Sequence, residues 1–96
     1  MLAAIVRRAA ERVPGVQQLA ERPRGRLFRE GATYEREGVR LTIMDGSIRV
    51  AVHLVIARDR NMHEVGAAVQ ASVAHELEQM VGMTVENVDV YVQDVT

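Results

Sequence analysis

Residues 38–57 read GVRLTIMDGSIRVAVHLVIA, and this stretch decides the fold. Apolar and polar residues alternate on both sides of Asp45-Gly46, which is typical of two strands that each bury one face. Asp and Gly tolerate the positive φ angles of a type I′ turn, so this dipeptide predicts a tight hairpin. Turn and strand pattern also predict one common register, in which the apolar residues face each other: Ile43 opposite Ile48, Leu41 opposite Val50 and Val39 opposite Val52.

One capped helix is predicted to follow the hairpin and to lead into a last strand. Asn61 is a favourable N-cap residue with Glu64 three positions later, and Gly82 suits the left-handed position that ends many helices. Strand, helix and strand in this order form a crossover, so the two strands are expected to be parallel. The expected buried stripe of the helix is Met62, Val65, Val69, Val73, Leu77, Met80 and Val81. The last strand is expected to turn three valines towards the core: Val88, Val90 and Val92.

The N-terminal part predicts a second, shorter helix that ends at Pro14-Gly15. Val16 and Leu19 then indicate a brief strand, and residues 21–37 are expected to form a loop or an edge strand. The helix is predicted from apolar residues that recur at helical spacing: Leu2, Ile5, Val6, Ala9 and Val13.

The predicted order of elements is α-β-β-α-β, with room for an extra short strand before Gly38. This order indicates an α+β fold: a two-layer sandwich with the helices on one face of a small mixed sheet. The chain length fits a single domain that spans residues 1–96.

Composition excludes several kinds of chemistry. The 96 residues include no cysteine and no lysine, so no thiol nucleophile, thiolate metal site or catalytic lysine can form. Residues 1–60 hold twelve arginines and seven acidic residues, net +5, whereas residues 61–96 hold no arginine and six acidic residues, net −6. Two parts of opposite charge are expected to attract each other, either within one fold or between copies of the chain. Alternatively, the charges simply form a mixed solvated surface.

Nothing in the chain resembles a membrane span or a secretion signal. No apolar run approaches the about 18 residues that suggest a transmembrane helix. Charged residues interrupt the apolar stripe at the N-terminus, whereas a signal peptide carries its charge before an unbroken apolar segment. We therefore expect a cytoplasmic protein.

The open face of the predicted sheet is the candidate interaction surface. Alternation places on it Arg40, Thr42, Arg49, His53, Asp89, Tyr91 and Gln93, together with Ala51. A polar open face also keeps a monomeric sheet soluble, which is the simpler interpretation. Val55 and Val95 are expected on this same face, where apolar residues would favour a protein contact.

Other functions find less support in the sequence. No acid pair, Ser-His pair or glycine-rich phosphate loop occurs in a suitable context, so we expect no enzyme and no cofactor. His63 and His75 are too far apart on the helix to share a metal ion, although a small ligand or metal could bind beside His53 and Tyr91. A nucleic-acid or ribosome-binding loop is the main alternative; it would use Arg22, Arg24, Arg26 and Arg29 with Phe28. The nearby glutamates and the sequence pI of about 6.3 weaken this alternative.

Several short motifs, in order and at suitable spacing, resemble the alkaline shock protein family. They are Val13-Pro14-Gly15-Val16, Gly38-Val39, Val69-Gln70 with Val73, Met80-Val81-Gly82-Met83 and Val88-Asp89-Val90-Tyr91-Val92. The resemblance covers nearly the whole chain except residues 21–37. The chain departs from the family at Arg58-Asp59, where members often have an aromatic residue and glycine, and at Ser72, where asparagine is frequent.

This resemblance implies a non-enzymatic protein of the bacterial envelope stress response. It also implies self-assembly and a small integral-membrane protein as partner, since both occur in the family. Our hypothesis from the sequence is therefore a cytoplasmic scaffold or adaptor that acts through protein–protein contacts and forms homo-oligomers.

Overall fold

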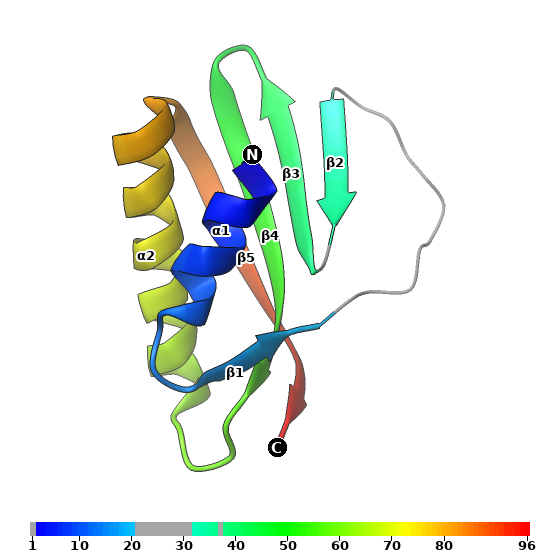
Figure 1. Ribbon diagram of the computed structural model, residues 1–96, viewed down its shortest axis with the longest axis vertical. Helices are drawn as coiled ribbons and strands as arrows, with labels where there is room; N and C mark the ends of the chain where they lie inside the picture. The colour runs from blue at the N-terminus through cyan, green and yellow to red at the C-terminus, as the bar shows by residue number, and fades with distance from the viewer. Residues whose placement is uncertain (1, 21–31, 37) are drawn as a thin grey trace.

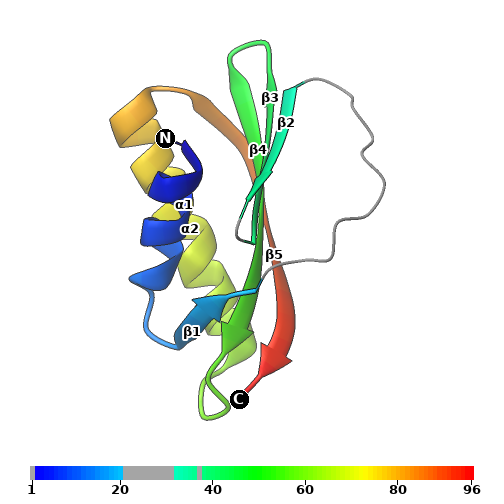
Figure 2. The ribbon, with the colours of Figure 1, turned by 45° about the vertical axis from the view of Figure 1, so that its right-hand side comes forward.

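Two helices cover one face of a mixed sheet (Figures 1 and 2). The computed structural model describes residues 2–20, 32–36 and 38–96. Within these residues the elements are α1 (Leu2–Glu11), β1 (Val16–Leu19), β2 (Ala32–Arg36), β3 (Val39–Met44), β4 (Ser47–Ile56), α2 (Met62–Val81) and β5 (Thr84–Val95). The expected α+β two-layer sandwich is confirmed. The brief strand indicated by Val16 and Leu19 is β1, and the extra short strand allowed for before Gly38 is β2.

Strand β4 is the centre of the sheet. β3 pairs antiparallel with its first half, β1 pairs antiparallel with its second half, and β5 pairs in parallel along its other edge. β2 adds to the far side of β3. Asp45 and Gly46 have φ angles of 43° and 80°, as a type I′ turn requires. The predicted hairpin register is also confirmed: Ile43 pairs with Ile48, Leu41 with Val50 and Val39 with Val52.

The hydrophobic core lies between the sheet and the two helices. Alternate residues of β4 supply its sheet side: Ile48, Val50, Val52, Leu54 and Ile56. α2 contributes Val65, Val69, Val73 and Leu77, and α1 contributes Val6, Ala9 and Ala10. Full burial of one such aliphatic side chain is worth about 1.5–3 kcal/mol for valine and larger residues, so this layer supplies most of the stability.

The ends of α2 follow the predicted capping residues, but its buried stripe is shorter than predicted. Asn61 Oδ1 accepts hydrogen bonds from the backbone N–H groups of His63 and Glu64, and Gly82 has a φ of 70°. Met62 and Met80, expected in the core, are 48% and 62% exposed. Helical periodicity overestimates the buried stripe at both ends of the helix, because neither methionine packs against the core.

Two β-bulges in β5 change which side chains face the core. Glu86 and Gln93 are the extra residues at these two irregularities in the pairing with β4. After the second bulge Asp94 pairs with Val55 and Val95 pairs with Ile56. Val95 therefore lies on the core side of the sheet, and its expected place on the open face is wrong.

The backbone of His53 holds β1 and β3 end to end along one edge of β4. Its N–H donates to the carbonyl oxygen of Gly38 (2.9 Å), and its carbonyl oxygen accepts from the N–H of Ala20 (2.8 Å). The two strands come so close here that a Cβ on Gly38 would lie 2.6 Å from the carbonyl oxygen of Ala20. Gly38 also has a φ of 82°, which favours glycine.

Replacement of Gly38 by alanine is expected to lower the free energy of unfolding by clearly more than the about 1–2 kcal/mol that a left-handed backbone costs a residue with a side chain. Gly46→Ala is the matched control, because Gly46 also has a positive φ but an added Cβ there meets nothing within 4 Å. Chemical denaturation measures both variants. Equal losses would show that the approach of Gly38 to Ala20 adds no constraint.

Candidate interaction surfaces

The residues of the predicted interaction surface come together on the face of the sheet opposite the helices. Strand pairing places them in rows: Thr42 beside Arg49, Arg40 and Asp89 on either side of Ala51, and His53 beside Tyr91. In this group Arg49, Asp89, Tyr91 and Gln93 are exposed, whereas Arg40 and Thr42 are half-buried. The alternation of the strands therefore located this face correctly.

His53 is not displayed on this surface, contrary to the prediction from alternation. Its side chain is 3% exposed. The Tyr91 ring stacks on the imidazole with 5.0 Å between ring centroids and 16° between planes, and Gln93 Nε2 lies 2.9 Å from Nδ1. An amide nitrogen can only donate, so Nδ1 is the acceptor in this contact. Ala51 and Val55, on the same side of β4, are buried as well. Alternation predicts to which face of the sheet a side chain on a central strand points. It does not predict whether neighbouring side chains bury that side chain.

Both bulges of β5 direct a polar side chain back onto β4. At the first, Glu86 Oε1 accepts from Arg49 Nη2 at 3.0 Å; at the second, Gln93 reaches His53. The hydrogen bond and the charge of Arg49 lower the pKa of the Glu86 carboxyl. Glu86 was not predicted from the sequence, because strict alternation would turn this residue towards the core.

The outer edge of β5 is a second candidate surface. Among the described strands β5 pairs only with β4. The carbonyl oxygen of Val88 accepts from Gln70 Nε2 on α2 at 3.0 Å, so this carbonyl points away from the β4 ladder. Both backbone groups of a strand residue point to the same side, and they alternate along the strand. The backbone N–H and C=O groups of Val90 and Val92 therefore also point away from β4, beside the exposed side chains of Tyr91 and Val92.

Other expected sites differ in how far the structure describes them. His63 and His75 are exposed on α2, and the described residues include no cluster of three or more potential metal ligands. In the same part of the chain, neither helix is long and apolar enough to cross a membrane. The arginine-rich alternative site, from Arg22 to Arg29, lies outside the described residues.

Comparison with known proteins identifies the family. All residues, 1–96, match the alkaline shock protein 23 family, which is described by its cell envelope-related function. The chain belongs to this family. The motifs in the sequence thus indicated the correct relationship. No curated protein sequence matches the chain significantly.

Solved structures of a domain called MamM CTD have the same fold as this family member. One form matches with a TM-score of 0.67 and 20% identity, and covers 97% of this chain and 94% of that domain. A variant in a nickel form gives the same values, and a variant in a manganese form has a TM-score of 0.66 at 20% identity. At this identity the likeness concerns the fold alone.

We predict that Gln93→Ala lowers the free energy of unfolding by about 1 kcal/mol, the net value of one hydrogen bond, or more if Nδ1 of buried His53 loses its donor without replacement. Gln18→Ala, at an exposed position of β1, is the control and should change stability by less than about 0.5 kcal/mol. Thermal and urea unfolding compare the two. Equal small effects would show that the Gln93–His53 contact is energetically irrelevant.

A second prediction concerns pH. Arg49 lowers the pKa of Glu86 in the folded state from its ordinary value of 4.5, so the pair stabilises the protein above that value. This contribution is lost as pH falls through the lowered pKa. Glu86→Gln should therefore be less stable than the wild type at pH 7 and approach it in acid, and added salt should reduce the difference at pH 7. A difference that is independent of pH would contradict the ion pair.

Proposed function

We propose that this protein is a non-enzymatic scaffold of the cell envelope that acts through protein–protein contacts and assembles with further copies of itself. Its family has a cell envelope-related function, and we propose that this function is that of a scaffold. In this proposal the protein works in the cytoplasm during envelope stress. A protein partner, such as a small membrane-anchor protein, then brings it to the membrane.

The observation that carries the proposal is the outer edge of β5. This strand has twelve residues and pairs on one side only among the described strands. An edge with outward N–H and C=O groups is a template for another strand, and natural proteins usually protect it with proline, lysine or a cover. β5 contains neither proline nor lysine. Its apolar side chains at the edge, Tyr91 and Val92, are 48% and 38% exposed.

A second copy of β5 is the partner that fits this edge. Gln70 already occupies the Val88 carbonyl, so the free segment begins after this residue. Antiparallel pairing about Tyr91 would place Val90 opposite Val92 and Asp89 opposite Gln93 of the other copy. This register joins outward-facing backbone groups and brings no two carboxylates directly opposite each other, which would destabilise the pairing.

The open face would then serve a different protein. This face is a surface of mixed charge that continues to the β5 edge. Its residues are Arg40, Thr42, Arg49, Asp89, Tyr91 and Gln93. Pairing of two copies at β5 would extend this surface across both sheets. We assign to it the contact with the membrane-anchoring partner, with His53 as a buried support for Tyr91 rather than as a contact residue.

The test is Val92→Pro. Proline removes the outward N–H of residue 92 and is tolerated on edge strands, so the variant should fold but lose pairing at β5. Val92→Thr is the matched control, because threonine keeps the N–H and suits a strand. Sedimentation velocity over a range of concentrations measures assembly, and circular dichroism checks folding.

We expect the wild type and Val92→Thr to form species larger than a monomer, and the fraction of these species in Val92→Pro to fall at least about tenfold, as the loss of two backbone hydrogen bonds predicts. In cells, membrane fractions should retain the wild type and lose it when membrane proteins are extracted with detergent. A wild type that is monomeric at high concentration and absent from the membrane fraction would overturn the proposal.

A further inference from the structure

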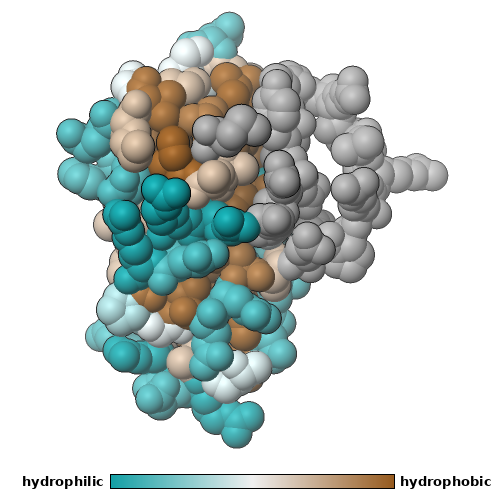
Figure 3. Space-filling view, viewed as in Figure 1, coloured by the Kyte–Doolittle hydropathy of each residue, from teal (hydrophilic) through white to brown (hydrophobic). Residues whose placement is uncertain are grey.

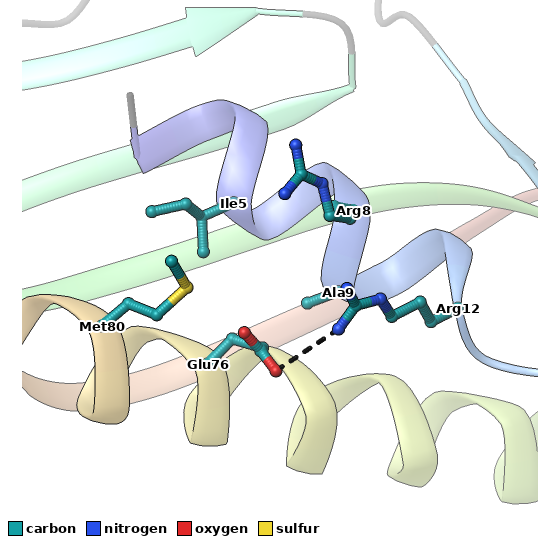
Figure 4. Close-up of a pocket in the computed structure, with 6 residues that line it drawn as sticks. All are labelled: Ile5, Arg8, Ala9, Arg12, Glu76 and Met80. Carbon is teal, nitrogen blue, oxygen red and sulfur yellow. Dashed lines mark ion pairs between the residues drawn. The ribbon is translucent and has the colours of Figure 1, made fainter.

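A small hollow between α1 and α2 has no part in the surfaces described so far. Ile5, Ala9 and Met80 form its apolar lining, and Arg8, Arg12 and Glu76 form its charged rim (Figure 4). Arg12 Nη1 lies 3.6 Å from Glu76 Oε1 and closes one side. On the helical side of the molecule, apolar surface is visible around the C-terminal end of α2, with polar residues beside it (Figure 3).

The size of the hollow decides what can occupy it. Its volume is about 140 Å³. Pockets for small-molecule ligands usually measure about 300–1,000 Å³. A cavity of about 150 Å³ accommodates a group of the size of benzene. The hollow therefore fits a single apolar side chain that enters from outside.

The charge of the rim decides which residue should accompany that side chain. Glu76 is already paired with Arg12. Arg8 is exposed and has no ion-pair partner among the residues that the structure describes. An apolar side chain would pack against the lining of the hollow, and a carboxylate next to it would form an ion pair with Arg8.

The β3–β4 turn carries this combination. Met44 is 44% exposed and precedes exposed Asp45 at the tip of the hairpin, which projects at one end of the molecule (Figure 1). The turn is held in shape, because Met44 pairs with Ser47 and its carbonyl oxygen accepts from Ser47 Oγ at 2.9 Å. A rigid turn loses little conformational freedom when it binds.

The other exposed methionine outside the hollow fits less well. Met62 is also about half exposed, but Arg58 and Arg60 precede it on the exposed loop before α2. Even with Asp59 between them, the loop residues 58–60 have a net positive charge, which does not complement Arg8 and Arg12. Of these two exposed methionines, Met44 with Asp45 is therefore the better match.

We infer that the Met44-Asp45 turn of one copy docks into the α1–α2 hollow of another copy, with Met44 in the apolar lining and Asp45 beside Arg8. The turn and the hollow are different surfaces, so the contact is heterologous and can continue from copy to copy. It rests on the proposed self-assembly but uses none of the β5 edge. Two-fold pairing at β5 alone stops at a dimer, whereas both contacts together extend the assembly.

Cysteine cross-linking tests the contact directly, because the natural chain contains no cysteine. One protein carries Met44→Cys, and a second carries Met80→Cys at the hollow. The control mixture pairs Met44→Cys with Met62→Cys, which is exposed at the other end of α2. All proteins also carry Val92→Pro, so that pairing at β5 does not contribute. We expect the disulfide-linked heterodimer with Met80→Cys to form several times faster than the control.

Charge variants provide the second readout. Asp45→Asn keeps a residue that tolerates the positive φ of the turn but removes the carboxylate, and Arg8→Gln removes the cation. Each should slow cross-linking to Met80→Cys about two- to fivefold, as loss of an exposed ion pair predicts, and higher salt should slow it similarly. Equal rates in the two mixtures, or rates that ignore both charge changes, would overturn the inference. Such a result would leave the β5 proposal intact, since Val92→Pro tests that edge separately.

Discussion

The architecture depends on the way one edge of β4 is shared between two strands. Backbone groups of His53 bond Gly38 at the start of β3 and Ala20 after β1. β1 and β3 thus lie in one line along β4, both strands contact α1, and their apolar side chains join the same core. A residue with a side chain at position 38 would separate these strands, because its Cβ would approach the Ala20 carbonyl to 2.6 Å.

This arrangement also explains why β5 pairs on one side only among the described strands. β1, β3 and β2 occupy one side of β4, and the crossover through α2 delivers β5 to the other side. Parallel strands need such a long connection, and here it places the longest strand at the rim of the sheet. The two bulges then turn Glu86 and Gln93 towards β4, so side chains as well as backbone hold this strand. The backbone N–H and C=O groups of β5 that do not bond β4 point away from the sheet.

The unequal distribution of charge along the chain has a counterpart in the fold. The ion pairs Arg12–Glu76 and Arg49–Glu86 each join the basic part, residues 1–60, to the acidic part, residues 61–96. The first links α1 to α2, and the second links β4 to β5. Of the interpretations open at the sequence level, attraction within one fold is therefore observed, although exposed pairs of this kind contribute little to stability.

The sequence by itself determined the hairpin register, both helices, the parallel crossover, the family and the face that bears Arg40, Arg49 and Tyr91. These features follow from local rules, because turn chemistry, capping and periodicity act between residues that are near in sequence. Only the tertiary structure decided that His53 is buried, that Met80 is exposed beside a hollow, and that bulges shift Glu86 and Val95. The reason is physical. The burial of a side chain, the extension of a helix beyond the core and a shift in strand register all depend on residues that are distant in the chain, so a local sequence pattern cannot predict them.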